Sequence, residues 1–295
     1  MLRREFLIAA SAAALGGVRA GAVVSRDTAA NVRVPSAPRL AFQVYAVRDL
    51  CARDFPGTLK AVREIGYEGV ETGRFYGLDA KGLGAAVRGA GLELVALQLY
   101  PHTLTEPNLK ETIRFCQDSG CRRINTAWFK GSAENENDWQ LVVNVINHAA
   151  EVCAREGIAI GYHNHDQEFS IRFDGKAVCE WLYERFSPRV LQEFDPGWCV
   201  LGGGDPLAWL ASHRRRNPTV HVMPAIADTA GLKPGGAGVA APRDRADWSR
   251  LIPALVRDGV EWFVAKPTSF PDSLADLAAS YRTLRGILAS GVEDK

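Results

Sequence analysis

The sequence has almost no net charge. It contains 35 Lys and Arg residues against 34 Asp and Glu residues, a formal charge of +1 at pH 7. Binding to nucleic acid phosphates needs an excess of basic side chains, so this balance gives no reason to expect a nucleic-acid partner. Apolar residues are not scarce: they make up 47% of the chain, which is enough for one large globular core.

Paired cysteine motifs are also absent. The chain has six cysteines and no Cys-x-x-Cys pair. They are Cys51, Cys116, Cys121, Cys153, Cys179 and Cys199. A large core does not need disulfides to be stable, so we expect free or buried thiols. Cys116 and Cys121 are the one local pair close enough in sequence to be worth examining for a disulfide.

Motifs for nucleotide cofactors are missing too. No Gly-x-Gly-x-x-Gly follows the first predicted strand, which removes the support for a dinucleotide-binding fold. The glycine-rich segment at 233–238 lacks the Lys-Ser/Thr of a phosphate-binding loop, and we interpret it as a flexible covering loop. No internal repeat is visible.

The N-terminus has the order of an export signal. Arg3-Arg4 and Phe6-Leu7 precede an apolar run at 8–18, and small residues follow at 20–22. We predict a twin-arginine-type signal peptide at 1–22, a flexible lead-in at 23–37 and a periplasmic protein. An uncleaved membrane anchor is the alternative, but the apolar run is too short to span a bilayer comfortably. After cleavage we expect no membrane association.

What the sequence does contain is an alternation of short β-rich runs with longer amphipathic ones. Eight candidate strands end near Tyr45, Thr72, Leu97, Thr126, Tyr162, Phe194, Val222 and Val264. Helical patterns cover residues 58–65, 108–119, 138–156, 247–258 and 274–288. Eight strand–helix units predict an α/β fold, a single-domain (β/α)8 barrel at 38–290 with a tail at 291–295. A doubly wound open sheet is the alternative.

In such a barrel the active site lies where the strands end. Polar or aromatic residues follow most of the predicted strand ends. They are Gln43, Arg48, Glu71, Gln98, His102, His163, His165, Asp166, Glu168, Asp195, Trp198, His221 and Lys266. We therefore expect residues that are far apart in the chain to converge on one rim. Trp128 and Trp198 are the candidates for stacking on a sugar ring.

Several segments together resemble the sugar phosphate isomerase/epimerase family, the xylose-isomerase-like barrels. The matching segments are Gln43-Val44-Tyr45-Ala46-Val47-Arg48-Asp49, Ile65-Gly66-Tyr67-Glu68-Gly69-Val70-Glu71, Phe75-Tyr76-Gly77-Leu78, Gly161-Tyr162-His163-Asn164-His165-Asp166, Phe194-Asp195 with Trp198, and Gly259-Val260-Glu261-Trp262-Phe263-Val264. The resemblance covers roughly residues 38 to 290. Each motif is modest alone, and their order and spacing are specific.

The resemblance implies one divalent metal, Mn, Mg, Co or Zn, held at the mouth by residues of strands five to eight. Carried over, it places His163, Asp195 and His221 at ligand positions. Ala265 stands where the family has a carboxylate, with Lys266 beside it. Gln98 stands where relatives often have His, and Val222-Met223-Pro224 where they commonly have Leu-Lys-Asp. The metal is then either absent, or weakly held with Glu71 or Glu168 as a substitute ligand.

The resemblance also implies a carbohydrate enzyme that transfers a proton next to a carbonyl. Glu71, His163, Glu168 and Lys266 are the candidate catalytic residues, and Lys266 could stabilise an enediolate in place of a metal. Gln43, Arg48, Gln98, His165, Trp128 and Trp198 are the candidate substrate-binding residues. The alternative is an inactive sugar-binding protein, or a partner of an active homologue. Both the enzyme and the binding protein are compatible with a homo-oligomer. A metal-dependent nuclease is disfavoured by the charge and by the altered ligands.

The first prediction concerns export. Replacing Arg3-Arg4 by Lys-Lys should block or slow translocation, because the twin-arginine pathway reads that pair. Pulse-chase fractionation of the two forms would measure it, and unchanged export of the variant would rule this pathway out.

Overall fold

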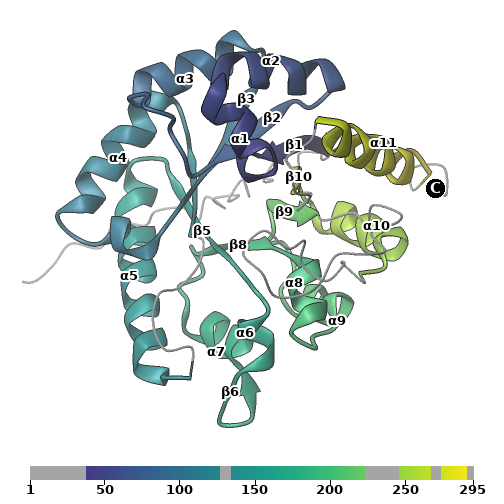
Figure 1. Ribbon diagram of the computed structural model, residues 1–295. Coiled ribbons are helices and arrows are strands. Elements are labelled where there is room, and N and C mark those ends of the chain that lie inside the picture. Colours follow the sequence, from purple (N-terminus) through teal and green to yellow (C-terminus); the bar gives the residue numbers. More distant parts are fainter. Residues whose placement is uncertain (1–37, 127–133, 223–245, 267–273, 291–295) are drawn as a thin grey trace, which may run out of the picture. The chain divides into compact units, whose positions relative to one another are not determined.

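The strands follow one another around a closed ring in a computed structural model of the chain. The structure describes residues 38–126, 134–222, 246–266 and 274–290. Residues 1–37, which include the predicted signal and lead-in, and Trp128 lie outside them. Eight parallel strands close in the order β1-β10-β9-β8-β5-β4-β3-β2, with helices around them (Figure 1). The prediction of a (β/α)8 barrel is confirmed, and closure of the ring excludes a doubly wound open sheet.

The observed elements follow the predicted alternation closely. The barrel strands are β1 (Arg39–Gln43), β2 (Gly69–Thr72), β3 (Glu93–Leu99), β4 (Arg123–Thr126), β5 (Ala159–His163), β8 (Leu191–Phe194), β9 (Thr219–Val222) and β10 (Trp262–Ala265). A short hairpin, β6 (Arg172–Phe173) with β7 (Lys176–Ala177), lies between β5 and β8. Each predicted strand end lies within two residues of the observed one.

The helices include several that the sequence patterns did not predict. The long ones are α2 (Phe55–Ile65), α3 (Ala80–Gly89), α4 (Asn108–Ser119), α5 (Glu136–Arg155), α10 (Trp248–Asp258) and α11 (Leu274–Ser290). The shorter ones are η1 (Val44–Val47), α1 (Arg48–Arg53), η2 (Pro101–Leu104), α6 (Gln167–Ser170), α7 (Val178–Arg185), α8 (Pro196–Leu201) and α9 (Pro206–Ser212). Among the described helices, none is long and apolar enough to cross a membrane.

Local signals explain where some of these helices begin and end. Helix α3, which was not predicted, begins after Asp79, whose side chain accepts a hydrogen bond from the Gly82 backbone N–H at 2.7 Å. Helix α4 ends at Gly120, which has φ +81°, a conformation that glycine adopts at little cost. Its bounds agree with the prediction from periodicity.

The inside of the barrel changes from apolar to polar along its axis. A small buried cluster of Ala41, Val95, Ala96, Trp262 and Val264 is separate from the large core that contains Phe42, Phe263 and Ala265. Because neighbouring residues of a strand point to opposite faces, Ala41 and Val264 face inward while Phe42 and Ala265 face the helices. Farther along the strands, Gln43, Glu71, Gln98 and Asn125 take the inward positions.

A glycine makes room for one of these polar side chains. Gly161 pairs with Asn125 across β5 and β4, and a Cβ at Gly161 would lie 2.4 Å from Asn125 Oδ1. The amide of Asn125 therefore occupies space that any other residue at 161 would fill.

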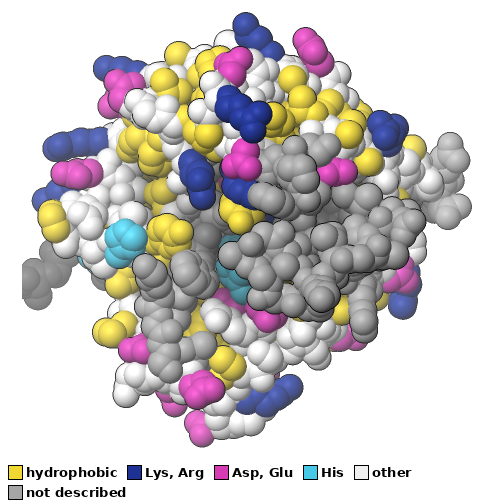
Figure 2. Space-filling view, in the orientation of Figure 1, with side chains coloured by type: hydrophobic (Ala, Val, Ile, Leu, Met, Phe, Trp, Pro, Cys, Tyr) yellow, Lys and Arg dark blue, Asp and Glu magenta, His cyan; other side chains and the backbone are white. Residues whose placement is uncertain are grey.

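All six cysteines are free and buried, as expected, so Cys116 and Cys121 form no disulfide. Burial raises the pKa of the Cys121 thiol to about 11, which keeps it protonated and unreactive. On the face drawn in Figure 2, acidic and basic side chains are interspersed around the edge.

Candidate active site

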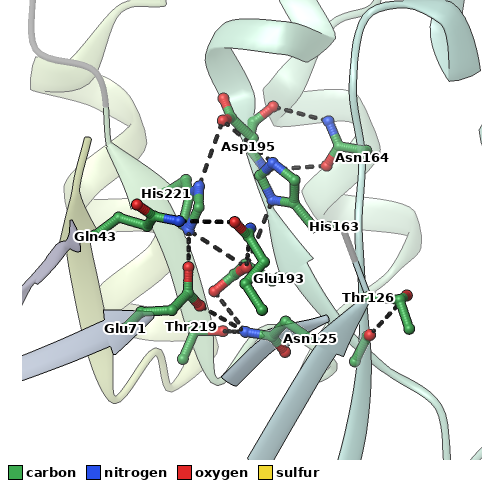
Figure 3. A network of polar contacts seen from close by, with 12 residues as sticks. Gln43, Glu71, Asn125, Thr126, His163, Asn164, Glu193, Asp195, Thr219 and His221 are labelled. Carbon is green, nitrogen blue, oxygen red and sulfur yellow. Dashed lines mark hydrogen bonds and ion pairs between the residues drawn. The ribbon is translucent and has the colours of Figure 1, made fainter. Parts of the chain in front are cut away.

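A buried cluster of polar side chains closes the carboxyl ends of the strands. Figure 3 shows the imidazoles of His163 and His221 between Asp195 on one side and Glu71, Glu193 and Asn125 on the other. These residues come from the ends of five strands, and Glu193 and Asp195 share one of them. His163 ends β5, Glu193 lies in β8, and His221 lies in β9, whereas Asp195 directly follows β8. All of these residues are at most 1% exposed.

The innermost part of the cluster is a pair of carboxyl groups joined by one amide. Asn125 Nδ2 donates to Glu193 Oε1 at 2.6 Å and to Glu71 Oε2 at 3.1 Å. The two carboxyl groups also share a hydrogen bond. Burial and the charge of Glu71 raise the pKa of Glu193 well above its ordinary value. Burial alone would raise the pKa of Glu71 as well, but the adjacent His221 and these hydrogen bonds lower it. One proton therefore resides on this pair, on Glu193.

Glu71 fixes the orientation of the His221 ring. His221 Nε2 donates to Glu71 Oε1 at 2.9 Å, since an ionised carboxylate can only accept. When the ring is neutral, its other nitrogen, Nδ1, carries the lone pair. It has no hydrogen-bond partner and lies 3.8 Å from Asp195 Oδ2. A carboxylate behind a histidine commonly holds the ring in this way when the histidine binds a metal.

His163 has a similar arrangement. Its Nδ1 faces Glu193 Oε2 at 3.6 Å, and its Nε2 faces Asp195 Oδ2 at 3.9 Å. Neither ring nitrogen has a hydrogen-bond partner in the described part of the chain. Burial, followed by the charges of His221, His165 and Lys266, lowers the pKa of His163 well below its ordinary value. The ring is therefore neutral, as a metal ligand or a proton acceptor must be.

Asp195 is held rigidly opposite the two rings. The Asn164 amide donates to the backbone carbonyl of Asp195 and accepts from its N–H, both at 3.0 Å. Asp195 Oδ1 accepts from the N–H of Trp198, which leaves Oδ2 without a hydrogen-bond partner. Burial raises the pKa of Asp195, and the charges of Lys266 and His221 oppose that shift.

Three atoms with unused lone pairs thus face one another: His163 Nε2, His221 Nδ1 and Asp195 Oδ2. Asp195 Oδ2 lies 3.9 Å from His163 Nε2 and 3.8 Å from His221 Nδ1. Two ligands bound to one ion at about 2.1 Å are at most about 4.2 Å apart, so Asp195 can share a divalent cation with either imidazole. Leaving such atoms buried and unpaired is costly without a ligand. Two imidazoles and one carboxylate favour Zn, Co or Mn over Mg.

A second possible cation position lies on the inner side of the rings. Atoms of His163, Glu193 and His221 lie within 4.8 Å of one another there. However, His221 Nε2 and Glu193 are already hydrogen-bonded to Glu71 and Asn125. A cation at that position would have to break the bond between Glu71 and His221. A cation bound by Asp195 and the imidazoles on the outer side would leave these hydrogen bonds intact, with Glu193 behind the rings.

The predicted residues Gln43 and Gln98 lie together beside this cluster. Gln43 Nε2 donates to Gln98 Oε1 at 2.8 Å, and Gln98 Nε2 is 3.5 Å from Glu193 Oε2. Gln43 also accepts from the backbone N–H of Tyr45. Their amides extend the polar layer across β1 and β3.

Lys266, which directly follows β10, lies on the side of the cluster, and Ala265 does not. Ala265 packs in the outer core, opposite in direction to Val264, which pairs with His221 on the inner face. Strand alternation then brings Lys266 inward. Its charge acts on His163, His165, Glu193 and Asp195. The assignment of Ala265 to the fourth ligand position is corrected accordingly: a side chain there points to the helices.

His165 and Trp198 adjoin the cluster on the outer side. The His165 ring lies 4.9 Å from that of His163 and 5.4 Å from that of Trp198, between centroids. Burial and the charge of Lys266 lower the pKa of His165 to about 3. Arg48 is placed differently, because its guanidinium lies over the Tyr45 ring and donates to the Tyr45 carbonyl.

Glu168 is not brought into this group. Its carboxylate accepts from the Tyr162 hydroxyl at 2.7 Å and from the His165 backbone N–H at 3.0 Å. Tyr162 precedes His163 and so points to the opposite face of β5, where its ring packs against Phe186. Burial raises the pKa of Glu168 to about 7, although these hydrogen bonds oppose the shift. Glu168 fixes the loop after β5.

Sequence reasoning missed Glu193 and Asn125. Glu193 lies two residues before Asp195 and therefore on the same face of the strand, which was a usable signal. Asn125 gave no signal, because a single Asn near a strand end is common in loops as well.

The raised pKa of Glu168 predicts a specific pH dependence of stability. The folded state binds its proton up to about pH 7, and the unfolded state only up to about 4.5, so stability decreases as pH rises between these values. Between pH 4.5 and 8, urea unfolding should show that the free energy of unfolding of the wild type decreases by up to about 3 kcal/mol more than that of Glu168→Gln. Glu64→Gln, on the exposed side of α2, should follow the wild type. Parallel curves for the wild type and Glu168→Gln would refute the assignment.

The link between Glu71 and His221 predicts an effect on metal binding. Glu71→Gln removes the negative charge behind His221 and should weaken the binding of Zn, Co and Mn roughly 10-fold or more. Titration calorimetry of chelator-treated protein measures it. Glu93→Gln, at the opposite end of the barrel, should leave the affinity unchanged. Unaltered affinity in Glu71→Gln would contradict the orientation argument, and no binding by the wild type would contradict the cation site itself.

Two solved structures with the same fold carry the names of sugar isomerases or epimerases. The chain is 20% identical to a sugar phosphate isomerase/epimerase from Parabacteroides distasonis ATCC 8503, covering 90% of this chain and 96% of that one, with a TM-score of 0.64. It is 14% identical to an L-ribulose 3-epimerase, covering 86% and 95%, with a TM-score of 0.63. At these identities the likeness establishes the fold.

The sequence comparisons agree. The inosose dehydratase of Geobacillus kaustophilus (strain HTA426) is 22% identical over 187 residues, which span 56% of this chain and 60% of that protein. The family model described as xylose isomerase-like TIM barrel matches residues 59–276. The chain therefore belongs to the xylose isomerase-like TIM barrel family.

Proposed function

We propose that the protein is a carbohydrate isomerase, epimerase or lyase that moves a proton on the carbon next to a carbonyl of a keto-sugar. The observation that carries this proposal is the group of His163 Nε2, His221 Nδ1 and Asp195 Oδ2. These are three unpartnered atoms at the barrel mouth, directly in front of a carboxyl pair that holds one proton.

The names of similar proteins support the same chemical step. Epimerising L-ribulose at C3 and dehydrating an inosose each require loss of a proton from the carbon next to a ketone. Isomerising a sugar phosphate between ketose and aldose does so as well. The shared step is a reason to expect it here, and the substrate is not carried over from any of them.

The residues of this chain have distinct roles in the proposal. A divalent cation held by His163, Asp195 and His221 would polarise the substrate carbonyl. Glu193 and Glu71 are the groups that we assign to proton transfer, because Glu193 lies 3.3 Å from His221 and 3.6 Å from His163. Gln43 and Gln98 are placed to hydrogen-bond sugar hydroxyls. Glu168 is left out, since its carboxylate is bound to Tyr162.

The second candidate is a sugar-binding protein without turnover. It is favoured by Lys266, which places an ammonium group on the inner face of β10 beside the proposed cation site and would weaken cation binding there.

Proton exchange in deuterated water tests the proposal. The Zn-, Co- or Mn-loaded protein should exchange the hydrogen next to the carbonyl of D-fructose or L-ribulose for deuterium, followed by NMR. His163→Ala and His221→Ala should each lower the exchange rate at least about 100-fold. His148→Ala, an exposed position on α5, is the matched control and should exchange at the wild-type rate. Sugar binding without exchange for every ketose would overturn the enzyme and leave the binding protein.

A further inference from the structure

Three polar groups at the rim have no function in holding the cation or in the carboxyl pair. They are the ammonium of Lys266, the Nδ1 of His165 and the indole N–H of Trp198. His165 Nδ1 and Trp198 Nε1 are buried and have no hydrogen-bond partner. No carboxylate among the described residues lies within 4.0 Å of the Lys266 ammonium, the distance of an ion pair. Unpaired buried nitrogens of this kind are expected where a ligand completes the hydrogen bonding.

The three groups lie on the same side of the barrel mouth. The rings of His165 and Trp198 lie 5.4 Å apart, on the outer side of His163. Lys266 follows Val264, which pairs with His221, and strand alternation brings its side chain to the same face. The Lys266 charge acts on both His165 and Asp195. They therefore border the outer side of the group formed by His163, Asp195 and His221, where a bound sugar would extend.

Among the described residues, no carboxylate is paired with Lys266. Its charge acts on Asp195, but Asp195 Oδ1 is bound to Trp198 N–H and its Oδ2 faces the two imidazoles. Glu193 and Glu71 are engaged with each other and with Asn125. An ammonium beside a cation site is unfavourable unless a negative group lies between or next to them.

We propose that Lys266, His165 and Trp198 bind a carboxylate of the substrate, so that the substrate class is a keto-sugar acid. This rests on the proposed function, because it assigns the far end of the same substrate. One ammonium with two N–H donors matches a group with one negative charge and two oxygens. A phosphate ester carries close to two negative charges, and Lys266 is the lysine or arginine named among the largest electrostatic effects on His163, His165 and Asp195. A hydroxymethyl group would leave the ammonium unpaired.

The test compares three ligands that differ at one carbon: D-fructose, D-fructuronate and D-fructose 6-phosphate have a hydroxymethyl, a carboxylate and a phosphate ester at C6. Calorimetry of the Zn-loaded protein should give D-fructuronate an affinity roughly 10- to 100-fold above that of D-fructose. Lys266→Met should reduce this preference to less than about 3-fold with D-fructose binding unchanged, and Lys266→Arg should retain most of it. Lys110→Met, on the exposed side of α4, is the control and should keep the full preference.

Several results would overturn the inference. Equal affinity of the wild type for D-fructose and D-fructuronate would remove the carboxylate site, and tighter binding of D-fructose 6-phosphate would assign a phosphate instead. An equal loss of both sugars in Lys266→Met would make Lys266 a structural residue. Each of these outcomes leaves the proposed proton transfer standing. Failure of all three ligands to bind would refute both proposals together.

Discussion

The cost of burying charge governs this structure. Glu71, Glu193 and Asp195 place three carboxyl groups beside two imidazoles, all fully shielded from solvent. Isolated charges in such a place would cost far more than the net stability of a domain. The protein reduces the cost by letting Glu71 and Glu193 share a proton, and by bringing the Asn125 amide between them. The result is a network in which each member needs the others.

The hydrogen bonding within the buried cluster is incomplete. On the inner side of the rings the two carboxyl groups and Asn125 Nδ2 are hydrogen-bonded. On the outer side His163 Nε2, His221 Nδ1 and Asp195 Oδ2 have no partner, and on the inner side His163 Nδ1 and Asn125 Oδ1 have none. The inner hydrogen bonds direct those lone pairs outward, since His221 donates through Nε2 to Glu71. Carboxylates behind metal-binding histidines act in this way. The unpartnered outer atoms are therefore the candidate ligand atoms, and the hydrogen-bonded inner groups hold the rings in place.

The barrel provides the space for this network by dividing its interior. Trp262 and Val264 belong to a buried apolar cluster that fills the barrel below the polar layer. Gly161 has no side chain, and the Asn125 amide occupies the space that one would fill. Proteins that share this fold at 14% to 22% identity have names of different activities. A shared barrel therefore does not by itself fix the chemistry, which depends on the residues at the site.

The sequence by itself determined the barrel, because eight hydrophobic runs with intervening helical patterns admit few other closed arrangements. It also brought His163, Asp195 and His221 to one rim, since the ends of parallel strands meet at one edge. It could not decide which side of a strand each residue faces to within one position: Ala265 was assigned to a ligand position although it packs in the outer core, and Glu168 was grouped with the site although it binds Tyr162 behind the strand. Glu193 and Asn125 became visible only in three dimensions. Their importance comes from contacts with Glu71, more than fifty residues away in sequence, and hydrogen bonding across a closed barrel leaves no local pattern in the chain.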